Sequence, residues 1–236
     1  MANPYARPQS DPSQQPLSAE AGPALRRATR ALVVLLVLGL CVRLGGIFFD
    51  LRLDSWLRAA EFGLEEDASP WRAGLGRTLG ARWLSWVLAV PAWWLWTWTA
   101  QRAARGHGLE LRHGGLAAVG WWFVPIANLF MPLRVLAELW CAAADPRPVA
   151  WRRQSFPSWI VLWWLSLLAI PMLGAALVEQ VADFFLGGVF DDSVTAARMH
   201  AIIRRDVALN GLVLVAGGLA LVIVTRISAG LLEGPR

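Results

Sequence analysis

The sequence predicts an all-α, polytopic membrane protein with four transmembrane helices and one broken, proline-interrupted helical segment that is re-entrant or interfacial. Two observations predict this class. Hydrophobic residues make up 56% of the 236 residues, and the mean hydropathy is +0.46, which exceeds the apolar share of ordinary soluble domains. The 22 basic side chains are all arginines, and they flank the apolar runs as membrane topology requires.

The net charge of +5 would also suit a nucleic-acid-binding protein. That class is excluded because no basic helix or aromatic sheet motif accompanies the charge. The two cysteines, Cys41 and Cys141, are too far apart in sequence to give a disulfide framework or a metal-binding spacing. His107 and His113 lack close metal ligands, so we expect neither a metal nor another cofactor.

The chain begins with an expected disordered cytoplasmic tail over residues 1–24, followed by a membrane domain over 25–232. Prolines at every fourth position in the tail, Pro4 to Pro16, leave too little apolar surface to offset the entropy of ordering. Arginines then precede an apolar run over 31–49. This run predicts a first transmembrane helix at 28–49, close to the ~20 residues that a bilayer requires.

Charged and apolar residues alternate at helical spacing over 51–64, which predicts a short amphipathic helix on the membrane surface. The second transmembrane helix is expected at 79–101 and carries six tryptophans. Such a stripe would suit a cofactor platform, but interfacial anchoring and helix packing explain it more simply. Pro91 is expected to kink this helix.

The last two transmembrane helices are expected at 157–179 and 206–226. Pro157 suits a helix start, and the glycines and alanines of the last helix permit close helix contact in lipid. In a four-span arrangement Arg43 approaches the leaflet that holds Glu179, Asp183 and Asp206. We therefore expect Arg43 to play a structural role by pairing with one of these acids.

The segment 114–145 is apolar enough to enter a bilayer, but prolines interrupt it. Pro125 and Pro132 each remove a backbone donor and disfavour a helical residue before them. They predict a half-helix that ends near Val124, a turn over 126–131, and a helix from Pro132. Four crossings place thirteen arginines on the cytoplasmic side, against ten with five crossings. The positive-inside rule therefore keeps this segment on the cytoplasmic side, with both termini.

Irregular backbone at membrane depth persists only where protein or water covers it, and transporters build binding sites from such broken helices. The candidate polar groups for a site are Asn128, Arg134 and Glu138, with Trp121, Trp122 and Trp140 as walls. Simpler roles stay open. Asn128 would cap the turn, and Arg134 and Glu138, four residues apart, would form a structural pair or a solvated face.

The stretch G-W-W-F-V-P-I-A-N-L-F-M-P-L-R-V-L-A-E-L-W over 120–140 resembles the signature of an uncharacterised bacterial membrane-protein family, the domain of unknown function 4328. The matching positions are Gly120, Trp121, Trp122, Phe123, Pro125, Asn128, Leu129, Pro132, Glu138, Leu139 and Trp140. Phe130 replaces a frequent tryptophan, and Cys141 and Ala142 replace a polar pair. The likeness covers roughly 80–225 and implies a polytopic bacterial membrane domain without assigning an activity.

The sequence contains no phosphate-binding glycine loop, zinc-protease motif or nucleophile elbow. We therefore expect a non-enzymatic scaffold, accessory or sensor protein of the bacterial inner membrane. The alternative is binding or transport of a lipid or small solute at 120–140. Membrane lipid is the expected partner, with a protein partner or a homo-oligomer left open.

Overall fold

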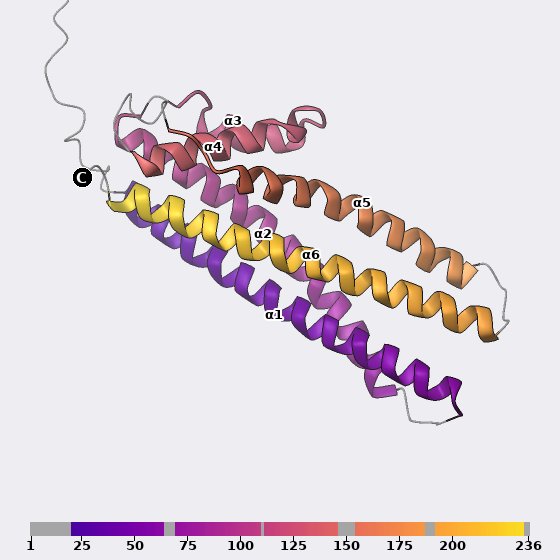
Figure 1. Ribbon diagram of the computed structural model, residues 1–236. Coiled ribbons are helices and arrows are strands. Elements are labelled where there is room, and N and C mark those ends of the chain that lie inside the picture. Colours follow the sequence, from indigo (N-terminus) through magenta and orange to yellow (C-terminus); the bar gives the residue numbers. More distant parts are fainter. Residues whose placement is uncertain (1–19, 64–68, 110, 146–153, 187–191, 234–236) are drawn as a thin grey trace, which may run out of the picture. The chain divides into compact units, whose positions relative to one another are not determined.

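The computed structural model describes residues 20–63, 69–109, 111–145, 154–186 and 192–233. The long helices are α1 (Ala21–Glu61), α2 (Ser69–Gly106), α5 (Ser158–Leu186) and α6 (Asp192–Glu233) (Figure 1). Between α2 and α5 lie α3 (Gly115–Gly120), the 3₁₀ turns η2 (Trp121–Phe123) and η3 (Ala127–Leu129), and α4 (Met131–Ala144). These ranges hold no strand, so the all-α class is confirmed for the described part of the chain.

Helix α1 corrects two expectations at the start of the chain. It begins at Ala21, inside the expected tail of 1–24, whose first 19 residues lie outside the described part. It also continues to Glu61 without a break, so no separate surface helix follows residue 49. Asp50 and Asp54 are buried, which a helix lying on the surface would not achieve. Gly63, with φ of 73°, follows the helix end in the left-handed conformation that suits glycine.

Three helices are long and apolar enough to cross a membrane, over Ala21–Glu61, Ser158–Glu179 and Ala197–Glu233. They contain the expected spans 28–49, 157–179 and 206–226. Helix α2, which contains the expected span 79–101 and Pro91, does not meet the same hydropathy criterion. Its tryptophans carry a polar indole N–H and contribute less hydropathy than aliphatic side chains. The expected number of four spans is therefore not confirmed.

The described helices contribute to two compact units. Unit 1 comprises residues 1–33, 91–160 and 222–236, and unit 2 comprises residues 34–90 and 161–221. Each of the four long helices has a part in both units. The broken segment lies wholly in unit 1.

Unit 1 is built on the fully buried Trp96 of α2. Its indole Nε1 donates to Ser228 Oγ of α6 at 2.9 Å, and the same oxygen lies 2.8 Å from Thr29 Oγ1 of α1. His107, just after α2, places Nε2 2.8 Å from the carbonyl oxygen of Leu231. Apolar side chains of α1, α4 and α6 complete this core: Leu25, Leu32, Val135, Leu139, Ile223, Val224, Ile227 and Leu231.

Unit 2 packs its helices through small residues and buried tryptophans. Trp163 Nε1 of α5 donates to the carbonyl oxygen of Ala216 in α6 at 2.9 Å. A Cβ added at Gly217 would lie 2.7 Å from a methyl group of Leu40 in α1. Ala216 and Ala220 are buried. Small residues on α6 thus allow the close approach expected of helices in lipid.

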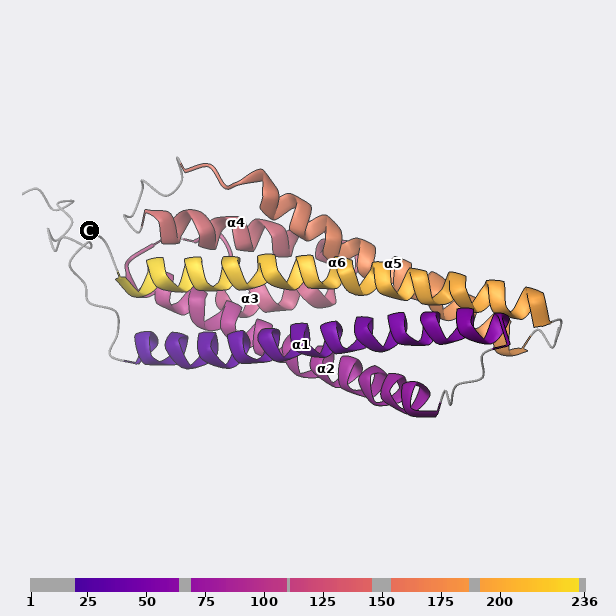
Figure 2. The same ribbon diagram turned by 60° about the horizontal axis from the view of Figure 1, so that its bottom comes forward.

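The broken segment has the expected form of a short helix, a turn and a second helix. The chain leaves η2 at Val124, which is extended (φ −97°, ψ 109°), as Pro125 requires of its predecessor. The backbone N–H of Asn128 then closes the turn onto the Val124 carbonyl at 2.7 Å. Helix α4 follows at Met131, with Pro132 in its first turn. Within unit 1, α3 and α4 contact each other and lie beside each other in Figure 1; Figure 2 shows the same helices turned by 60°.

Neither helical run of this segment reaches transmembrane length. Helix α3 and η2 together cover residues 115–123, and α4 has 14 residues. A single membrane-crossing helix needs about 20.

Candidate functional site

The candidate site lies beside α4, whose placement follows from its apolar face. Pro132 suits the first helical turn because no backbone donor is needed there, and Val135, Leu136 and Leu139 are buried. On the α6 side, a Cβ at Gly230 would lie 2.2 Å from the Ala143 carbonyl oxygen. Only glycine therefore permits the close approach of α6 to α4 in unit 1.

The exposed side of α4 borders a cleft of about 510 Å³, within the usual volume range of small-molecule sites. Its lining comes from the loop before α3, from α4 and from the segment just before α5: Arg112, His113, Arg134, Ala137, Glu138, Cys141 and Gln154. Two of the predicted binding residues, Arg134 and Glu138, therefore share one cleft.

The electrostatics of the cleft centre on Glu138. Burial raises the pKa of its carboxyl, while the charges and backbone amides of His113 and Arg112 act in the opposite direction. Burial has the largest effect because the charged carboxylate loses hydration there. Arg112 and Arg134 are exposed. No ion pair joins Arg134 to Glu138 in the described chain, so both arginines keep guanidinium donors that face solvent.

Two further observations concern hydrogen bonding and thiol reactivity in the cleft. Glu138 Oε2 is buried and lacks a hydrogen-bond partner among the described residues. Cys141 places Sγ 3.4 Å from the Gln154 carbonyl oxygen, and burial, followed by the charge of Glu138, raises the pKa of this thiol. A raised pKa keeps the sulfur protonated and unreactive. The cleft therefore offers charge and hydrogen bonds without an activated nucleophile.

The other predicted binding residues do not line this cleft. Asn128 Oδ1 and Trp121 Nε1 are buried without a hydrogen-bond partner in the described chain. Asn128 therefore closes its turn through its backbone and not through the side-chain cap that the sequence suggested. Trp140 packs edge-on against Trp159 with ring centroids 5.5 Å apart, and Trp122 is half-buried.

The first part of the broken segment, from α3 to the turn, exposes large apolar side chains. These are Leu116, Phe123, Val124, Ile126, Leu129 and Phe130. Contiguous exposed apolar surface marks contact with lipid or another apolar partner. Pro125, at the centre of this region, is also exposed, whereas Pro132 is buried.

A second charged cluster lies in unit 2, and sequence reasoning identified it only in part. Arg82 of α2 binds Asp206 of α6 at 2.6 Å and Asp50 of α1 at 3.1 Å. Arg43 donates to Asn210 Oδ1 at 3.0 Å, and Asp206, one of the three acids expected for Arg43, is bound by Arg82. The sequence signal that was missed is Arg82 itself. It lies within the expected span 79–101, and a charge at that depth needs a partner.

The sequence also proposed Glu179 and Asp183 as structural acids near Arg43. The Glu179 side chain is exposed, and the Asp183 side chain lies outside the described part. Within the described ranges, no three His, Cys, Asp or Glu side chains gather closely enough to hold a metal ion.

Comparison with known proteins gives one match. A family model described as "Domain of unknown function (DUF4328)" matches residues 65–229. No curated protein and no solved structure matches the chain.

Proposed function

We propose, from the premise that the chain belongs to the DUF4328 family, that it is a four-span bacterial membrane protein with a ligand-binding cleft beside α4. The ligand carries an anionic group and a hydrogen-bond donor. One observation supports this proposal: Glu138, Arg112 and Arg134 line the same cleft of about 510 Å³. Within it, Glu138 Oε2 lacks a hydrogen-bond partner among the described residues.

The fourth span is α2, which has 38 residues where about 20 suffice. In unit 2, Arg82 binds acids of α1 and α6. In unit 1, Trp96 binds Ser228 of α6. These bonds to two candidate spans support a similar membrane depth for α2. Its large exposed apolar side chains suit a lipid-facing surface: Leu79, Trp83, Leu84, Val87, Leu88 and Leu95.

The orientation follows from the arginines. With four crossings both termini and the cleft lie on the cytoplasmic side, where positive charge accumulates. The exposed apolar turn over 123–130 then enters the lipid from that side. The cleft therefore lies near the level of lipid headgroups.

The charges of the cleft select the ligand. Arg112 and Arg134 present planar donors that suit a phosphate or carboxylate. The Glu138 oxygen without a partner suits an ammonium or hydroxyl donor, because a buried acceptor gains most from a hydrogen bond. A zwitterionic group with phosphate and primary ammonium offers both. It occurs in a phosphatidylethanolamine headgroup and in a soluble glycerophosphoethanolamine.

The test uses the full chain in nanodiscs that contain equal phosphatidylethanolamine and phosphatidylcholine. We expect phosphatidylethanolamine to be retained at least about tenfold more strongly, because the quaternary ammonium of phosphatidylcholine cannot donate to Glu138. Native mass spectrometry measures the retained lipids. Glu138→Gln should abolish the preference, whereas the exposed Glu179→Gln should keep it.

Equal retention of the two lipids by the unaltered chain would contradict the proposal. Competition by glycerophosphoethanolamine at concentrations that leave other bound lipids in place would identify a soluble ligand instead of a lipid. The scaffold, accessory or sensor role stays a prediction. It depended on the lack of a known catalytic motif in the sequence, with the tail and the cytoplasmic helix as surfaces for partners.

A further inference from the structure

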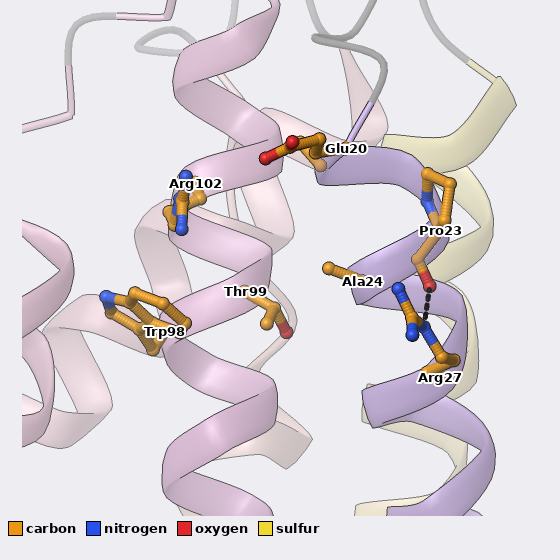
Figure 3. Close-up of a pocket in the computed structure, with 8 residues that line it drawn as sticks. Glu20, Pro23, Ala24, Arg27, Trp98, Thr99 and Arg102 are labelled. Atoms are coloured by element: carbon orange, nitrogen blue, oxygen red, sulfur yellow. Dashed lines mark hydrogen bonds between the residues drawn. The ribbon is translucent and has the colours of Figure 1, made fainter.

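A second cleft, of about 380 Å³, lies between the start of α1 and the end of α2 within unit 1. Figure 3 shows Pro23, Ala24 and Arg27 on α1, and Trp98, Thr99 and Arg102 on α2. Glu20 and Ala21 complete the lining. None of these residues borders the cleft beside α4, so the two clefts are separate.

The two arginines of this cleft are oriented by contacts that leave most of their donors free. Arg27 uses Nε to reach the Pro23 carbonyl oxygen at 3.4 Å, which is drawn as the dashed line in Figure 3. Arg102 stacks its guanidinium on the Trp98 ring, 4.9 Å from the ring centroid. Stacking uses the face of the guanidinium and leaves the N–H groups at its edge available.

The charge of the cleft is positive. Neither Arg27 nor Arg102 forms an ion pair with another described residue, and Glu20 is the single acid in the lining. Arg27 and Arg102 line this cleft from two different helices, and a guanidinium suits a phosphate group because it can bind it through two N–H donors.

The position along α1 indicates where this phosphate comes from. The apolar run of α1 begins at Ala31, one turn after Arg27, and α1 is a candidate membrane span. Trp98 of α2 and Ala24 of α1 give the cleft an apolar lining beside the two arginines. Basic pockets between transmembrane helices at this level bind anionic lipid headgroups, and tryptophan favours the same interface.

The geometry points to a binding site for the phosphate of an anionic phospholipid, with Arg27 and Arg102 as its ligands and Trp98 as the support of Arg102. This site does not depend on the ligand proposed for the cleft beside α4. Glu20, at the edge of the site, opposes the bound phosphate by like charge.

The test places the full chain in nanodiscs of phosphatidylcholine with a minor fraction of phosphatidylglycerol and measures retained phosphatidylglycerol by native mass spectrometry. We expect Arg27→Gln and Arg102→Gln each to weaken retention about fivefold. Glu20→Gln should strengthen retention, because it removes the opposing charge. An improved affinity cannot arise from a folding defect.

Arg26→Gln is the matched control, because Arg26 is exposed on α1 and does not line the cleft. It should leave retention within about twofold of the unaltered chain. Equal weakening by Arg26→Gln, or unchanged retention in Arg27→Gln and Arg102→Gln, would overturn the site. Displacement of the lipid by millimolar inorganic phosphate would overturn its assignment to a lipid.

Discussion

Arg82 is held between two acids from different helices, with its side chain 4% exposed and that of Asp50 2% exposed. Gly46 makes room for this guanidinium, since a Cβ there would lie 1.9 Å from Nη2. Removal of one partner from a buried ion pair leaves an uncompensated charge. We therefore expect Arg82→Ala to lower the free energy of unfolding by about 3–5 kcal/mol.

Reversible unfolding in mixed micelles measures this change. Arg77→Ala, on the same helix at an exposed position, should stay within about 0.5 kcal/mol of the unaltered protein. Neutralising Asp50, Arg82 and Asp206 together should cost less than Arg82→Ala alone, because neither acid is then a buried charge that has lost Arg82. A loss below about 1 kcal/mol in Arg82→Ala would show that water reaches the cluster.

Glu138 gives a prediction for pH. Burial raises its pKa in the folded chain above the ordinary value of about 4.3. At pH values between the ordinary pKa and the raised pKa of the folded chain, the folded state therefore binds more protons than the unfolded state. Stability should fall as pH rises through this window and then level off. Glu138→Gln should flatten that part of the stability curve, and an identical curve for the variant would contradict the assignment.

At the scale of elements, the sequence predicted where a helix is interrupted better than it predicted where a helix ends. Pro125 and Pro132 predicted the turn of the broken segment because each forbids a specific backbone arrangement. The hydropathy of 28–49 marked only the apolar part of α1. The helix extends to Glu61, since no glycine or proline interrupts 47–61 and Asp50 has a buried partner. Such long-range partners cannot be identified from local sequence.

The same limit applies to the candidate site. Arg134 and Glu138 were identifiable because they are charges on an otherwise apolar helix. Arg112, His113 and Gln154 enter the cleft only because the loop before α3 and the chain before α5 fold beside α4. Their sequence neighbours give no sign of this, so these three of the seven lining residues required the structure.

The contact between α4 and α6 gives a prediction for these elements. A Cβ at Gly230 would meet the Ala143 carbonyl oxygen at 2.2 Å, and a backbone atom cannot rotate away. Gly230→Ala should therefore destabilise the protein by about 1–3 kcal/mol. Gly218→Ala, on the same helix with nothing within 4 Å of the added Cβ, should stabilise it by up to about 1 kcal/mol. Chemical unfolding of the two variants checks both signs, and destabilisation by both would point to a general effect on α6.

For the whole molecule, the arrangement in the membrane decides what both clefts can bind. Hydropathy alone identifies three spans, while the bonds of Arg82 and Trp96 tie α2 to two of them. With three crossings the termini would lie on opposite sides of the membrane. In the proposed arrangement with four crossings, both termini and both clefts would lie on the cytoplasmic side, where anionic lipid is available to arginine.

Single cysteines in a chain without Cys41 and Cys141 test this arrangement. Phe62 follows α1 and is 81% exposed. A cysteine placed there by Phe62→Cys should be labelled by an impermeant maleimide from outside intact cells. Arg112→Cys, Gln154→Cys and Glu233→Cys should react only in inside-out vesicles, because four crossings place these exposed positions in the cytoplasm. Labelling of Phe62→Cys and Arg112→Cys from the same side would show that α2 does not cross the bilayer. Labelling of Arg112→Cys and Gln154→Cys from opposite sides would make 114–131 a crossing, despite the short helices of that segment.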